Sequence, residues 1–380
     1  MPTMIELFPL PSADALRALE ELPGALDAVL PLKPAHRRDL PEAVRELSER
    51  LTCERGGNER PYWSSPRLAS AYLRYFLPWN LLRLCRVLGA LELPDPPALA
   101  SERAMLLDIG SGPLTLPLAL WLAKPAWRDL PLDLVCLDSS PRALDLGRAL
   151  FARVAGEKSA WRIIPLRAGV HAFARAVRGR PWLIGAVNVL NELKTERADA
   201  FAEQAAKLLR AGGALLSVEP GTRLGAGLVQ NLREASLALG LTPAQPCPHV
   251  RPCPLRGTRR WCHFSLSVKG APNWLAQLTQ EAGLGKKELH LSFALLRKQG
   301  GRQAEHMMEA PGKGATETLE ARVISAPFKV KGEEGLARYA CGARGLLLLT
   351  GAADAPSGAL VPVKWPARPR RDERSGAWIL

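Results

Sequence analysis

The sequence has none of the features that direct a chain to a membrane or through one. Residues 1–12 contain no basic cluster followed by a long apolar run, and the acidic Glu6 and Asp14 are unusual for a transit peptide. No uninterrupted apolar stretch is long enough to cross a bilayer. We therefore expect a cytoplasmic protein with no membrane partner.

Acidic residues are missing from one long stretch and are outnumbered in the whole chain. Residues 235–280 contain no Asp or Glu, and 51 Lys and Arg against 37 Asp and Glu give a formal net charge of +14. A positive field of this size favours an anionic partner, and no cationic amphipathic helix points to a membrane surface. We expect the partner to be nucleic acid; an arginine-rich composition inherited from a GC-rich genome is the alternative.

The Cys-x-x-Cys pairs that are typical of structural zinc sites are also missing. The chain has seven cysteines, and without a secretory signal we expect reduced thiols. Cys247, Cys253 and Cys262 lie in one proline- and arginine-rich segment, separated by five and by eight residues. Thiolates on irregular loops with this spacing favour an iron–sulfur cluster, and a zinc ion or unligated thiols are the alternatives.

Such a cluster needs a fourth ligand from elsewhere in the chain. We expect Cys341 in this role, with His249 and His263 as the alternatives. Basic residues crowd the same segment and either offset the negative charge of a thiolate-bound cluster or contact phosphates. They are Arg251, Arg256, Arg259, Arg260 and Lys269.

The apolar pattern divides the chain into three parts. Residues 1–100 have helical spacing and predict an N-terminal helical domain. Residues 101–242 alternate short apolar runs with helical segments, which predicts a mainly parallel sheet. Residues 243–380 predict the cysteine-rich loop and a small β-rich module with a polar loop at 299–318 and a basic tail after Lys364. We expect the strands of the sheet at 104–109, 132–137, 161–166, 182–190 and 214–219.

A glycine-rich loop follows the first predicted strand. Residues 106–112 (LLDIGSG) end that strand at Asp108 and turn through Gly110 and Gly112 into a helix, whose N-terminal amides face the loop. The dinucleotide fingerprint Gly-x-Gly-x-x-Gly is incomplete because Thr115 occupies its third glycine position. An acid two residues before the first glycine fits S-adenosylmethionine better, with Asp108 orienting the amino-acid end of the ligand through the loop.

Polar residues also end the next strands. Asp138 closes the second strand, where a carboxylate can accept both ribose hydroxyls of an adenosine ligand. Together with the loop it predicts a class-I (Rossmann-like) S-adenosylmethionine methyltransferase fold; a nicotinamide site and an empty Rossmann-like fold are the alternatives.

The strand near residues 182–190 ends in Asn188, Asn191 and Glu192, which either contact donor or acceptor or cap the next helix. Methyltransferases that act on exocyclic base amines usually have Asn/Asp-Pro-Pro-aromatic here, and this chain does not. No catalytic residue can therefore be named, and methyl transfer from a sulfonium needs mainly in-line positioning.

These motifs resemble the methyltransferase-like family associated with the small ribosomal subunit, best known through its mitochondrial members. The resemblance rests on residues 108–113 (DIGSGP), 189–193 (VLNEL), the segment 247–264, and residues 322–324 (RVI) with the later Cys341. It covers roughly residues 60 to 345, and the cysteine segment is its specific part. One departure is Leu114, which occupies a position where many such loops have a further glycine.

The resemblance implies an S-adenosylmethionine-type domain and a [4Fe-4S] cluster held by Cys247, Cys253, Cys262 and Cys341. It also implies binding to ribosomal RNA of the small ribosomal subunit during assembly or early translation. Three hypotheses follow: an RNA methyltransferase, a non-catalytic RNA-binding assembly factor that uses cluster and donor structurally, and a small-molecule methyltransferase. We expect a monomer.

Overall fold

The computed structural model describes residues 7–53, 62–97, 103–192, 198–299, 318–330, 335–352 and 354–380. Helices form the first part, as the apolar spacing predicts, and Ser12 caps the first of them by accepting the Ala15 amide (3.2 Å). None of the helices in these ranges combines the length and the apolarity needed to cross a bilayer. In order they are α1 (Ala13–Val29), α2 (Pro34–Cys53), the 3-10 turn η1 (Tyr62–Ser64), α3 (Pro66–Ala71), the π-helical turn η2 (Tyr72–Phe76) and α4 (Leu77–Ala90).

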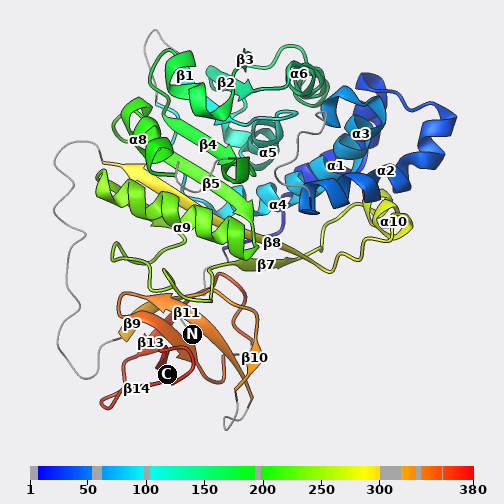
Figure 1. The fold of residues 1–380 in the computed structure, drawn as a ribbon. Coiled ribbons are helices and arrows are strands. Elements are labelled where there is room, and N and C mark those ends of the chain that lie inside the picture. Colours follow the sequence, from blue (N-terminus) through cyan, green and yellow to red (C-terminus); the bar gives the residue numbers. More distant parts are fainter. Residues whose placement is uncertain are drawn as a thin grey trace.

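An eight-stranded sheet forms the centre of the molecule (Figure 1). Its five parallel strands are β1 (Ala104–Ile109), β2 (Leu132–Asp138), β3 (Trp161–Arg167), β4 (Leu183–Val187) and β5 (Ala214–Pro220). β8 (Glu288–Lys298) runs antiparallel between β5 and β6 (Leu241–Gln245), and β7 (Phe264–Ser267) pairs with the other end of β8. The order β3-β2-β1-β4-β5-β8-β6 is that of class-I methyltransferases, so the predicted fold class is confirmed.

Alternate side chains of β1 bury against two different helical layers. Leu107 and Ile109 face the layer of α7 (Phe173–Ala176), α8 (Ala198–Leu208) and α9 (Arg223–Ala238). Leu106 belongs to the larger core, which includes α5 (Thr115–Ala123), α6 (Pro141–Ala155) and the N-terminal helices. Since α4 packs along α5 and α1 along α6, the helical region is a continuation of this layer.

The sheet does not follow the predicted boundary at residue 242. β7 and β8 lie in the range predicted for the third part, yet both join the first sheet, and the strand at 288–298 was not foreseen. The reason is topological: the position between β5 and β6 is filled by β8, a strand that returns antiparallel after the cysteine segment and α10 (Asn273–Glu281). The polar loop predicted at 299–318 lies almost entirely outside the described residues.

The C-terminal module is a second sheet with its own small core around Leu347 and Trp365. In Figure 1 it lies below the first sheet, in orange and red. The basic tail foreseen after Lys364 is part of this sheet, because the backbone of Leu380 pairs with Leu348 and Thr350. Its strands are β9 (Thr318–Val323), β10 (Phe328–Lys329), β11 (Leu336–Gly342), β12 (Gly345–Leu349), β13 (Leu360–Lys364), β14 (Arg370–Arg371) and β15 (Trp378–Ile379).

Candidate functional site

The candidate ligand site lies at the edge of the first sheet where β1 and β2 end. The parallel register pairs Ile109 with Leu137, so the glycine loop and Asp138 leave the sheet side by side. Gly110 and Gly112 adopt left-handed backbone conformations (φ 69° and 52°), which glycine takes without steric cost. The Gly110 amide donates to the Leu137 carbonyl (2.8 Å) and so ties the loop to β2.

Gly110 is also enclosed by its neighbours. A Cβ added at this position would lie 2.3 Å from Cγ2 of Val189, which follows β4. The Val189 amide donates to Oε1 of Glu219 (2.9 Å), a fully buried carboxylate at the end of β5. Because the hydrogen bond to Glu219 fixes the Val189 backbone, the loop has no room for a side chain at position 110.

Leu114 departs from the glycine-rich pattern without filling the site. It takes a left-handed conformation (φ 59°), which costs a non-glycine residue roughly 1–2 kcal/mol. Its buried side chain points toward α6, since a Cβ added at Gly147 would lie 2.7 Å from its Cδ1. It is not among the residues that line the ligand cavity.

Two carboxylates lie beneath the loop. Oδ2 of Asp138 accepts the Gly112 amide and its Oδ1 accepts the Ser140 amide, both at 2.8 Å. Burial raises the pKa of Asp138 against the effect of these amides. Asp108 is fully buried and accepts the Ser111 hydroxyl; its burial, with the charge of Asp138, raises its pKa to about 7. A ligand cation beside Asp108 would therefore favour its ionised form.

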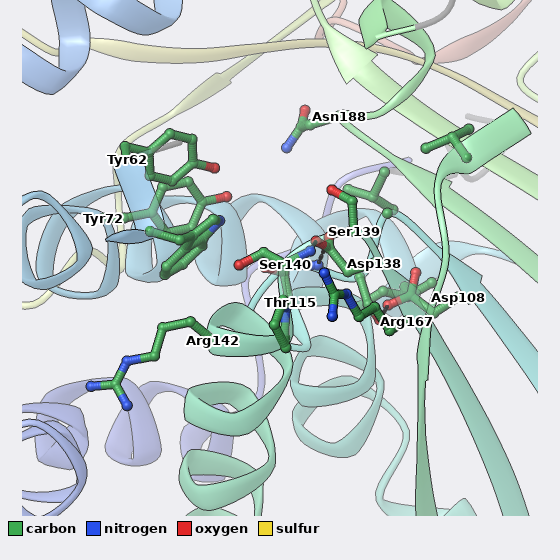
Figure 2. A pocket seen from close by; sticks show the side chains of 18 of the residues that line it. Tyr62, Tyr72, Asp108, Thr115, Asp138, Ser139, Ser140, Arg142, Arg167 and Asn188 are labelled. Carbon is green, nitrogen blue, oxygen red and sulfur yellow. Dashed lines mark hydrogen bonds between the residues drawn. The ribbon is translucent and has the colours of Figure 1, made fainter. Parts of the chain in front are cut away.

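A cavity of about 740 Å³ opens at these groups (Figure 2). Of the residues predicted for the site, those that line it are Asp108, Gly110, Gly112, Asp138 and Asn188. The N-terminal helical region supplies another side of it with Tyr62, Trp63 and Tyr72, which we call the aromatic wall. Figure 2 shows the rings of Tyr62 and Tyr72 on the opposite side from Asp108 and Arg167.

The two predicted asparagines are placed differently. Asn188 has a left-handed backbone (φ 55°), lines the cavity, and accepts a hydrogen bond from the buried Arg83 (3.0 Å). Asn191 does not line the cavity, and its Oδ1 is buried without a partner among the described residues. The side chain of Glu192 lies outside the described residues.

Sequence reasoning missed two charged groups behind the cavity, Arg83 on α4 and Glu219 on β5. Burial lowers the pKa of Arg83 to about 10, while the charges of Glu219 and Tyr72 favour its ionised form. Oε1 of Glu219 also accepts the Leu190 amide (2.8 Å). The available signals were an arginine within an apolar helix and a glutamate within a buried strand.

A second candidate site joins the loop between β6 and β7 to the C-terminal module. One cavity of about 50 Å³ is lined by all four predicted ligands: Cys247, Cys253, Cys262 and Cys341. Neither histidine lines it, although Nε2 of His249 lies 3.2 Å from Sγ of Cys341. Within the described ranges, no group of three or more His, Cys, Asp and Glu side chains has the geometry for a single metal ion.

Two arginines that the sequence did not single out as charge partners face these thiols. Arg233 on α9 donates to Sγ of Cys247 (3.2 Å) and to the carbonyls of His249 and Arg251 (both 2.9 Å). Arg322 on β9 lines the same cavity and donates to the Pro246 carbonyl (3.0 Å). Burial raises the pKa of Cys247, and Arg233 counteracts this.

The arginines of the cysteine segment lie on the outside instead. Arg251, Arg256, Arg259 and Lys269 are exposed, and Arg260 stacks over the ring of Tyr339 at 4.9 Å. The basic residues of the C-terminal module are exposed too: Lys364, Arg368, Arg370, Arg371 and Arg374. Charge compensation at the thiols and the outer basic surface are therefore carried by different residues.

Comparisons with known proteins relate the chain to one family and to several solved structures. A family model described as mitochondrial small ribosomal subunit Rsm22 matches residues 66–340. Similar solved structures include a methyltransferase from Pyrococcus furiosus (15% identity, 52% of this chain and 77% of that one, TM-score 0.32). Another is magnesium protoporphyrin IX methyltransferase from Synechocystis with bound SAH (12% identity, 67% and 93% of the chains, TM-score 0.37). No curated protein matches the chain.

The family match corrects one prediction. A cytoplasmic location was expected, and it is wrong, because the matched family is described as mitochondrial. That expectation rested on the composition of residues 1–14, which are not part of the match. The resemblance to a small-subunit family is confirmed.

Proposed function

The chain belongs to the Rsm22 family of the mitochondrial small ribosomal subunit, and we propose that it binds S-adenosylmethionine at the glycine loop and acts on small-subunit ribosomal RNA. The observation that carries this proposal is the cavity at the end of β1 and β2, where the glycine loop and two buried carboxylates meet. A volume of about 740 Å³ lies in the range of small-molecule sites. The methyltransferase-like fold supports the proposed donor, and the small-subunit family supports the proposed RNA substrate.

The donor fits the groups that line this cavity. Asp138 already accepts two backbone amides and keeps further lone pairs for ribose hydroxyls. Asp108, whose burial raises its pKa to about 7, would become ionised beside the ammonium group of the methionine end. Gly110 lines the cavity while Val189 fills the space that a Cβ would need, so the loop presents bare backbone to the ligand.

We also propose that the second site holds a four-iron cluster. The four thiols converge on one cavity, and Arg233 and Arg322 would offset the negative charge of a thiolate-bound cluster. Such a cluster would link the loop that carries Cys247 covalently to β11 of the C-terminal module. Its role in this proposal is structural, and no step of the reaction passes through it.

The outer basic surface is the proposed contact with RNA phosphates. Replacing Arg251, Arg256 and Arg259 together by Ala should weaken binding to small-subunit ribosomal RNA. The magnitude of the slope of log affinity against log salt concentration should fall by about 2, because the variant neutralises fewer phosphates and its binding therefore releases fewer counterions. Fluorescence anisotropy over a salt series, with iron content measured on the same samples, would test this.

The matched control removes the same charge elsewhere. Arg148, Arg153 and Lys158 are exposed on and just after α6, and their replacement by Ala changes net charge equally. Equal loss of affinity in both triple variants would contradict a localised RNA contact. Loss of iron in the first variant would mean that these arginines support the thiol site instead.

Methyl transfer has a direct test. Base-resolution mapping of small-subunit ribosomal RNA, with and without the gene, should reveal one methylated position that depends on this protein. A variant with Asp138 replaced by Ala should lose the same mark. An unchanged methylation map alongside intact RNA binding would leave the non-catalytic assembly factor as the function.

A further inference from the structure

The aromatic wall gives the cavity two chemically different sides. Asp108, Asp138 and the glycine loop present carboxylates and amides, whereas Tyr62, Trp63 and Tyr72 present rings. The rings of Tyr62 and Tyr72 are nearly parallel, with centroids 5.5 Å apart and an interplanar angle of 13°. Both tyrosines are half-buried, and the buried Trp63 packs against each of them at 5.1 and 4.9 Å.

The backbone that carries Tyr72 is unusual as well. Tyr72–Phe76 form a π-helical turn between α3 and α4. Such turns are rare in proteins, and those that occur are often found at functional sites. The turn brings Phe76 alongside Tyr72, with centroids 5.7 Å apart and an angle of 29°, and so extends the stack. Pro78, in the first turn of α4, has no amide hydrogen to donate to the Arg74 carbonyl, which is a local cause of the turn, and Tyr72 at its start lines the cavity.

The end of β4 offers no aromatic ring to an acceptor. The residues that follow this strand are Asn188, Val189, Leu190 and Asn191, none of them aromatic. An unstacked base needs a flat apolar surface to replace the stacking that it loses when it leaves its neighbours. Within the cavity that surface is supplied by the aromatic wall, from a part of the chain that precedes the sheet.

We propose that the aromatic wall is the acceptor subsite, where one unstacked base of single-stranded RNA lies against the Tyr62–Tyr72 rings and faces the donor. The inference rests on the proposed function and names its substrate class: a nucleobase presented by a single-stranded region. Asn188 lies at the cavity edge in Figure 2, where its amide can contact the edge of that base. Arg83 is a positioning residue, since it holds the Asn188 side chain at 3.0 Å.

The salt dependence of RNA affinity distinguishes base stacking from phosphate binding, because the two respond differently to salt concentration. Replacing Tyr72 by Leu should lower affinity for small-subunit RNA by about tenfold, because each stacked base contributes strongly to binding. The loss should be the same at every salt concentration, with an unchanged slope, because no phosphate contact is removed. Tyr72→Phe keeps the ring and should bind within about twofold of wild type.

The controls use the full-length protein. S-adenosylmethionine affinity by calorimetry should be unchanged in Tyr72→Leu, and Trp121→Leu, a half-buried ring at the far end of α5, should bind RNA normally. If Tyr72→Leu does not fold, Tyr62→Leu on η1 replaces it. Wild-type RNA affinity in a folded Leu variant overturns the subsite, as does loss of donor affinity alone. Wild-type protein that binds no small-subunit RNA would instead refute the proposed function.

Discussion

Protein purified without oxygen is expected to be brown, with about four iron atoms per chain, and Cys341→Ser is expected to lose most of that iron. Cys341 is the sole one of the four thiols that comes from the C-terminal module; the other three come from the loop between β6 and β7. Without it, the remaining three thiols leave one iron without a protein ligand. Iron and sulfide analysis with visible absorbance would measure the loss.

The same variant should also loosen the C-terminal module. Arg322 would still bridge to the Pro246 carbonyl, but the proposed covalent link would be gone. We expect a lower thermal midpoint and faster proteolysis of the C-terminal module. Cys85→Ala is the matched control, since this buried thiol lies against the Ala119 carbonyl, away from the cavity. Colourless wild-type protein with one zinc would contradict the cluster; full iron in Cys341→Ser would make His249 the ligand.

The strands of the first sheet could be predicted because each is a short apolar run ended by a polar residue. The runs at 104–109 and 214–219 match β1 and β5 within one residue. β8 was missed because its run begins after a polar stretch and its place depends on pairing with β5, which lies about seventy residues earlier. The local pattern of apolar residues predicts which segments are strands, but it holds no information on which distant strands pair with each other.

The sites divide in the same way. The glycine loop, Asp138 and the four cysteines could be named because each lies in a short motif with its own chemistry. Trp63, Tyr72, Arg83 and Arg233 could not, because they reach their sites through packing between distant elements. The arginines named as either charge partners or phosphate contacts proved to be exposed, except for the half-buried Arg260, since proximity in sequence does not fix which side of a loop a side chain takes.

Gly110→Arg is expected to abolish S-adenosylmethionine binding, with at least about a 100-fold loss of affinity, equivalent to about 2.7 kcal/mol. Any Cβ at this position meets Cγ2 of Val189 at 2.3 Å, and Val189 cannot retreat because its amide is bound by Glu219. The loop must therefore move away from β4, and its amides leave the donor. Calorimetry, with thermal melting to verify folding, would measure the effect.

The control separates backbone strain from loss of the site. Gly156 also has a positive φ (82°, with ψ 154°), which side chains other than glycine rarely adopt, but a Cβ there meets nothing within 4 Å, and it lies after α6, away from the cavity. Gly156→Ala should therefore keep donor affinity while losing stability through backbone strain, on the order of 1–3 kcal/mol. Asp138→Ala provides a second route, because it removes the acceptor of the Gly112 amide together with the proposed acceptor of the ribose hydroxyls. If folded Gly110→Arg binds the donor with wild-type affinity, the donor site lies elsewhere, because a ligand bound to this loop would have been displaced.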